Sequence, residues 1–81
     1  MIRPLVVLDP GHGGRDPGAV NELAGVSEAE MTLDVCQRAK ALLSNCCEVV
    51  LTREKDCYVS LRARPGLANK LKADAFVSYH F

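Results

Sequence analysis

The chain has 81 residues, of which 48% are apolar, and its 10 basic residues balance 10 acidic residues to a formal net charge of zero. This length predicts one small domain with a single core, since a chain of this size buries only about 60% of its unfolded surface. The balanced charge argues against nucleic acid or an anionic membrane surface as a partner. No apolar run approaches the roughly 20 residues needed to cross a bilayer, so we expect no membrane span.

The first predicted element is the apolar run Leu5–Leu8, which is typical of a parallel strand covered on both faces. It is followed by a loop over residues 9–14, which contains three glycines and a proline. A second loop over residues 16–25 leads to a helix. Ser27 and Glu30 form a capping-box pattern at the start of that helix, with the Glu30 side chain expected to return to the cap amide.

The apolar positions of this helix recur at spacings of three and four, and the predicted buried stripe consists of Met31, Val35, Ala39 and Leu42, widened by Cys36 and Leu43. A second buried strand is predicted at Val49–Leu51. The next helix is expected over residues 61–73, and it either begins near Pro65 or tolerates that proline close to its start. A third strand follows at Ala75–Tyr79.

The predicted fold class is therefore α/β, with the order β-α-β-α-β and a parallel sheet joined by helical crossovers.

Ligands of such sheets bind at the carboxyl ends of the strands. Both histidines of the chain, His12 and His80, follow strands at that edge. Glu28 begins the first helix and points toward the same place. Two imidazoles and a carboxylate are a known zinc-binding set, so we predict a metal site from these three residues. Glu30 is the weaker carboxylate candidate, because it lies about 200° around the helix from Glu28.

Two further residues are candidates for supporting roles. Asp9 either accepts a hydrogen bond from His12 or caps the turn that follows it. Arg53 either binds a substrate carboxylate or pairs with Asp56 or Glu54. The glycine-rich loop after the first strand matches neither the dinucleotide fingerprint nor the P-loop, so a phosphate site is disfavoured.

Two groups of residues are expected to be structural. The basic residues of the second helix predict a solvated face: Arg62, Arg64, Lys70 and Lys72. The cysteines match no familiar disulfide or metal motif, so we expect reduced, structural thiols at Cys36, Cys46, Cys47 and Cys57.

The sequence resembles the zinc-dependent N-acetylmuramoyl-L-alanine amidases of bacterial cell-wall turnover and phage lysis. The matching segments are Val7–Gly14, Asp16–Ala19, Glu28 with Met31–Leu33, Leu51–Arg53, Leu61–Arg64, Ala68–Asn69 and Ala73–His80. The resemblance implies zinc at His12, Glu28 and His80. It also implies peptidoglycan as substrate and hydrolysis of the amide between N-acetylmuramic acid and L-alanine.

Family domains are about twice this length, and their general-base glutamate lies in the part that would follow Phe81. We therefore expect residues 1–81 to be a single, truncated amidase catalytic domain, inactive alone. The alternative is a non-catalytic zinc- or cell-wall-binding module.

An open sheet edge predicts self-association. The absence of a signal pattern after Met1 predicts synthesis in the cytoplasm and action on the cell wall after release or export.

Overall fold

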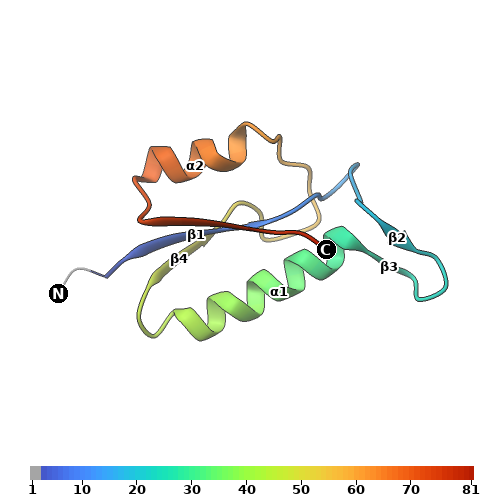
Figure 1. Cartoon of the computed structure of the whole chain (residues 1–81), viewed down its shortest axis with the longest axis horizontal. Helices are drawn as coiled ribbons and strands as arrows, with labels where there is room; N and C mark the ends of the chain where they lie inside the picture. The colour runs from blue at the N-terminus through green and yellow to red at the C-terminus, as the bar shows by residue number, and fades with distance from the viewer. Residues whose placement is uncertain (1–2) are drawn as a thin grey trace.

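A computed structural model describes residues 3–81, and Figure 1 shows its two helices on either side of a small sheet. The elements in chain order are β1 (Leu5–Pro10), β2 (Val20–Asn21), β3 (Val26–Ser27), α1 (Glu28–Leu43), β4 (Glu48–Leu51), α2 (Ala63–Leu71) and β5 (Ala75–Tyr79). The sheet is parallel in the order β4-β1-β5, so the predicted β-α-β-α-β unit is confirmed. None of the helices in this part of the chain is long and apolar enough to reach across a bilayer.

The central strand β1 is covered on both faces, as its continuous apolar sequence predicts. Val7 and Leu8 are fully buried, and Leu8 pairs with Leu51 on one side and with Val77 on the other. The strand continues past the predicted end at Leu8, because β5 pairs with two more residues, Asp9 opposite Ser78 and then Pro10. This extension makes Asp9 a strand residue rather than a loop residue, and its buried carboxylate contacts Arg64 of α2.

Helix α1 begins as predicted, with Ser27 as N-cap and its hydroxyl oxygen accepting the Glu30 N–H at 3.2 Å. The second bond of the capping box is missing, since no hydrogen bond within residues 3–81 joins the Glu30 side chain to the cap amide. The predicted buried stripe is also wrong in part, because Met31 is 44% exposed and Leu42 is 78% exposed. Cys36 is buried as predicted, and Ala39 and Leu43 pack against the core. The other buried residues of α1 are small or polar: Glu28, Ala29 and Thr32. Small side chains let the helix lie close to β1, where the Thr32 hydroxyl donates to the Gly11 carbonyl at 2.8 Å.

Helix α2 spans Ala63–Leu71 and is shorter than the predicted range of 61–73. Pro65 falls in its first turn, where the missing N–H has no helical partner to lose. Of the two predicted possibilities, the helix does not begin at Pro65; it begins two residues earlier and tolerates the proline near its start. Leu61 precedes the helix and is 81% exposed, so it is not part of the apolar side.

A short hairpin, β2–β3, replaces part of the loop predicted over residues 16–25. Its turn places Gly25 at a φ of 69°, a conformation that glycine adopts without strain. The hairpin folds Ala19 back onto the start of α1, where the Ala19 carbonyl accepts the Glu28 N–H at 2.7 Å. This contact helps to fix the first turn of the helix that carries Glu28.

Strands β4 and β5 form the two edges of the sheet in residues 3–81, and most of β5 is exposed. Self-association through such an edge stays a prediction. All four cysteines are unpaired, and only Cys36 is buried in the core. Cys46 is exposed, and its thiol donates to the Leu43 carbonyl at 3.5 Å, so a structural role for this residue stays a prediction.

Candidate metal centre

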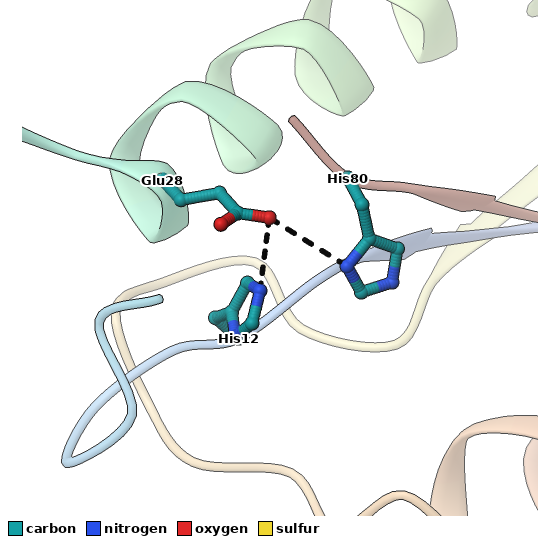
Figure 2. A group of neighbouring side chains, drawn as sticks. All are labelled: His12, Glu28 and His80. Carbon is teal, nitrogen blue, oxygen red and sulfur yellow. Dashed lines mark hydrogen bonds and ion pairs between the residues drawn. The ribbon is translucent and has the colours of Figure 1, made fainter. Parts of the chain in front are cut away.

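His12, Glu28 and His80 converge at the carboxyl end of the sheet, as the sequence predicts (Figure 2). His12 follows β1, His80 follows β5, and Glu28 is the first residue of α1. One carboxylate oxygen, Glu28 Oε2, lies 2.9 Å from His12 Nε2 and 3.7 Å from His80 Nδ1. The three ligand atoms all lie within 4.8 Å of one another.

Glu28 is held in place by two backbone amides. Its Oε1 accepts the Ala19 N–H at 3.1 Å, and its Oε2 accepts the Phe81 N–H at 3.1 Å. These two hydrogen bonds are the main reason that the pKa of Glu28 is lowered, and the neighbouring His12 adds to the effect. The carboxylate therefore stays ionised near neutral pH, which a cation ligand requires.

His12 is oriented by Asp16, a residue that the sequence analysis did not identify as part of the site. The Asp16 carboxylate lies 3.0 Å from His12 Nδ1, which leaves Nε2 to face Glu28. The hydrogen bond to Asp16 is the largest cause of a raised His12 pKa, while desolvation acts in the opposite direction. A carboxylate behind a metal-binding imidazole fixes the ring orientation and raises its basicity as a ligand.

His80 is oriented by Ser78, which lies two residues earlier, in the last part of β5. The Ser78 hydroxyl oxygen is 3.1 Å from His80 Nε2, and the hydroxyl donates to Asp9 Oδ2 at 2.7 Å. In this chain of hydrogen bonds Ser78 accepts from the Nε2–H group of His80, so the free Nδ1 faces Glu28. Asp9 thus supports one of the two candidate histidines, but it is His80 and not His12, the partner named in one of the two predicted alternatives.

Asp9 is 3% exposed and forms an ion pair with Arg64, whose Nη1 lies 2.8 Å from Asp9 Oδ1. Burial by itself raises the pKa of Asp9, but hydrogen bonds from Ser78, Thr52 and Arg64 outweigh burial and hold the pKa below its ordinary value. The prediction that Arg64 belongs to a solvated basic face is wrong, because its side chain is 5% exposed. The Asp9 carboxylate offsets the charge of this buried guanidinium.

The lowered pKa of Asp9 predicts a loss of stability in acid. Its pKa is below the ordinary value of 3.8 in the folded state, so the ionised carboxylate stabilises the fold above about pH 4. This contribution disappears as the pH falls through the folded-state pKa. We expect the difference in free energy of unfolding between the wild type and Asp9→Asn to shrink between about pH 5 and about pH 2 in urea titrations. A difference that stays constant over that range would contradict the assigned role of Asp9.

Arg53 does not occupy the exposed position predicted for a substrate ligand. Its guanidinium is 3% exposed and donates to backbone carbonyls of Pro10, Gly11, His12, Ala29 and Lys55. It also forms no hydrogen bond with Asp56 or Glu54 within residues 3–81. Both predicted roles of Arg53, as a substrate ligand and as an ion-pair partner, are therefore wrong. The buried guanidinium instead hydrogen-bonds the backbone around His12 and at the start of α1.

The three donors fit a divalent metal ion of the zinc type. Two ligands bound about 2.0–2.1 Å from a tetrahedral zinc ion lie about 3.3 Å apart, and the separations of 2.9 Å and 3.7 Å from the shared carboxylate oxygen bracket that value. Each of the three side chains also has a further hydrogen-bond partner: Asp16 for His12, Ser78 for His80, and the Ala19 and Phe81 amides for Glu28. Three protein ligands leave a fourth coordination position, the pattern of catalytic rather than structural sites.

A cavity of about 430 Å³ adjoins the two histidines. Its polar wall includes Asp9, Asp16 and Ser78, and its apolar wall includes Tyr58 and Phe76. The site therefore has an open approach from the side of α2, with room for part of a substrate beside the ligand atoms.

A family model described as N-acetylmuramoyl-L-alanine amidase matches residues 6–81. The chain is 40% identical over 81 residues to N-acetylmuramoyl-L-alanine amidase AmiC of Escherichia coli O6:H1 and 42% identical over 78 residues to the endolysin of Bacillus phage SPP1. These matches cover 96% and 94% of this chain but only 19% and 28% of the two relatives.

The crystal structure of N-acetylmuramoyl-L-alanine amidase from Clostridium difficile 630 is similar, with a TM-score of 0.92 and 36% identity. The match covers 98% of this chain and 44% of the solved chain. The chain thus spans less than half the length of these relatives, and the similarity includes the segments that carry all three candidate ligands.

Proposed function

Because the chain belongs to the N-acetylmuramoyl-L-alanine amidase family, we propose that it is the zinc-binding part of an enzyme that cleaves peptidoglycan. The bond hydrolysed is the amide between the lactyl group of N-acetylmuramic acid and L-alanine of the stem peptide. Such a substrate places the site of action at the cell wall. The observation that carries the proposal is the convergence of His12, Glu28 and His80 on one centre.

The chemistry follows from the donor set. Zinc held by these residues supplies a Lewis acid that polarises a carbonyl and makes a nearby water more acidic. His12 Nε2, Glu28 Oε2 and His80 Nδ1 would hold the ion, and the cavity beside the histidines would receive the scissile amide. Hydrolysis then yields a lactyl carboxylate and the free amine of L-alanine.

A general base must take the water proton and pass it to the leaving amine. The acidic side chains at the site in residues 3–81 are already engaged: Glu28 as ligand, Asp16 with His12, and Asp9 with Arg64 and Ser78. We propose that the base is a glutamate outside these 81 residues, as the family resemblance implies. The chain alone is therefore expected to bind zinc without hydrolysing peptidoglycan.

A chimera tests this function. Residues 6–81 replace the matching segment of the Clostridium difficile amidase, and release of stem peptide from purified peptidoglycan is measured with and without zinc. We expect zinc-dependent release by the chimera, none by its His80→Ala variant and none by the 81-residue chain alone. A folded, zinc-loaded chimera without activity would favour the non-catalytic binding module. Release by the chain alone would show that the base lies within it.

Zinc binding is also expected to stabilise the fold. Free zinc at about 100 times its dissociation constant should raise the free energy of unfolding by about 2.7 kcal/mol, since the unfolded chain does not bring the three ligands together. Urea unfolding with and without zinc measures this difference. Glu28→Ala should abolish the stabilisation, and Glu30→Ala, the matched control, should keep it because Glu30 is exposed. Loss of the zinc effect in Glu30→Ala but not in Glu28→Ala would reverse the ligand assignment.

A further inference from the structure

Two buried arginines approach the segment that carries His12. Arg53 lies just after β4 and is 3% exposed, and Arg64 lies in the first turn of α2 and is 5% exposed. Both guanidinium groups donate to the same atom, the His12 carbonyl oxygen, each at 2.9 Å. Charged groups are rarely placed in so small a core unless their hydrogen bonds are satisfied.

The His12 backbone needs such support. Its φ is 64°, in the left-handed region that is uncommon for residues other than glycine. Conformations of this kind persist only where surrounding contacts enforce them. Two charged donors on the His12 carbonyl supply that constraint and so fix the direction in which the imidazole leaves the chain.

Arg53 joins His12 to the element that carries Glu28. Besides the His12 carbonyl, its Nη2 group donates to Gly11 O at 3.0 Å and to Ala29 O at 2.9 Å. Ala29 is the residue after Glu28 in the first turn of α1. The planar guanidinium of Arg53 therefore links the backbone at His12 to the backbone next to Glu28.

Arg64 joins His12 to the element that carries His80. Its Nη1 group donates to Asp9 Oδ1 at 2.8 Å, and the other oxygen of Asp9 accepts from Ser78 at 2.7 Å. Ser78 in turn lies 3.1 Å from His80 Nε2. Hydrogen bonds thus run without a break from the His12 carbonyl through Arg64, Asp9 and Ser78 to the second imidazole.

We propose that Arg53 and Arg64 are positioning residues of the metal centre, Arg53 setting His12 against Glu28 and Arg64 setting His12 against His80. This inference rests on the proposed zinc site and adds the residues that give it its geometry. The forked guanidinium is essential, because it donates to several acceptors in one plane. Lysine keeps the charge but cannot reproduce that pattern.

The test is zinc affinity and the ligand-field spectrum of bound cobalt in Arg53→Lys, Arg64→Lys and Ser78→Ala. We expect each variant to raise the zinc dissociation constant about 10- to 100-fold and to change the cobalt spectrum, as is typical when an outer partner of a ligand is lost. Arg62→Lys, an exposed arginine next to α2, should leave both unchanged. Ser78→Thr keeps a hydroxyl and should restore both.

Variants that fold to the wild-type circular dichroism spectrum and bind both ions like the wild type would overturn the proposal. If the arginine variants do not fold, Ser78→Ala tests the role of Arg64 in their place. This substitution breaks the same chain of hydrogen bonds, and the Ser78 side chain lies outside the core. Thr32→Val decides for Arg53, because it removes the hydroxyl that Arg53 and Gly11 share without changing the side-chain shape. Failure of the wild type to bind zinc would instead overturn the proposed function, and the positioning roles with it.

Discussion

Asp9→Asn is expected to lower the free energy of unfolding by about 3–5 kcal/mol, the usual result of removing one partner of a buried ion pair. Asparagine keeps the shape of the side chain but leaves the Arg64 guanidinium, which is 5% exposed, without a counter-charge. It also weakens the hydrogen bonds from Ser78 and Thr52, which both end on the Asp9 carboxylate. Urea unfolding at neutral pH measures the loss, which is a large part of the roughly 4–12 kcal/mol expected for a chain of this length.

Asp34→Asn is the matched control for this prediction. Asp34 pairs with Arg38 at 3.0 Å on the exposed face of α1, where both side chains are more than half exposed. Removing a solvent-exposed pair should change the free energy of unfolding by less than about 1 kcal/mol. Equal changes in the free energy of unfolding for the two substitutions would show that the buried Asp9–Arg64 pair contributes no more to stability than an exposed pair.

His12→Ala is expected to raise the zinc dissociation constant at least about a hundredfold. Structural zinc sites with four protein ligands have an apparent binding free energy of roughly 10–16 kcal/mol, so the share of one ligand is about 3 kcal/mol. Competition with a chelator of known affinity measures the change. Asp16→Asn, which leaves the ligand but removes its hydrogen-bond partner, should have an intermediate effect of about 10-fold or more.

Arg15→Ala is the control in the same loop. Arg15 lies over the Tyr58 ring, 4.2 Å from its centroid, and takes no part in the ligand set. Its removal should leave the zinc dissociation constant unchanged. If His12→Ala binds zinc as tightly as Arg15→Ala, His12 is not a ligand.

The order of elements and the meeting of the three candidate ligands could be predicted because their signals are local. A continuous apolar run marks β1, a serine N-cap marks the start of α1, and glycines mark the loop after β1. Parallel topology then brings the carboxyl ends of β1 and β5 to one edge without any knowledge of side-chain contacts. The position of His12, Glu28 and His80 follows from these few facts.

The hydrogen-bond partners of the ligands could not be predicted in the same way, because they depend on strand register and on which charges are buried. Asp9 meets Ser78 only because those two residues are paired across β1 and β5. A buried arginine such as Arg64 has the same sequence pattern as a solvated one. One usable signal was present, since His80 comes two residues after Ser78 at the end of a strand, a spacing that favours the same face of the sheet.

The buried face of α1 was predicted only in part for a related reason. Hydrophobic periodicity gives most weight to large apolar residues, and it therefore favoured Met31 and Leu42. The helix instead packs through Ala29, Thr32 and Cys36, whose small size permits a close approach to β1. The most buried face of the helix is thus not its most hydrophobic one.

The most direct test of the account is anomalous X-ray diffraction at the zinc absorption edge from crystals of this chain grown with zinc. The account predicts one strong peak within about 2.0–2.2 Å of His12 Nε2, Glu28 Oε2 and His80 Nδ1. A peak only at the neighbouring thiols of Cys46 and Cys47, whose sulfur atoms are 3.6 Å apart, would contradict it. So would the absence of any peak between the two histidines.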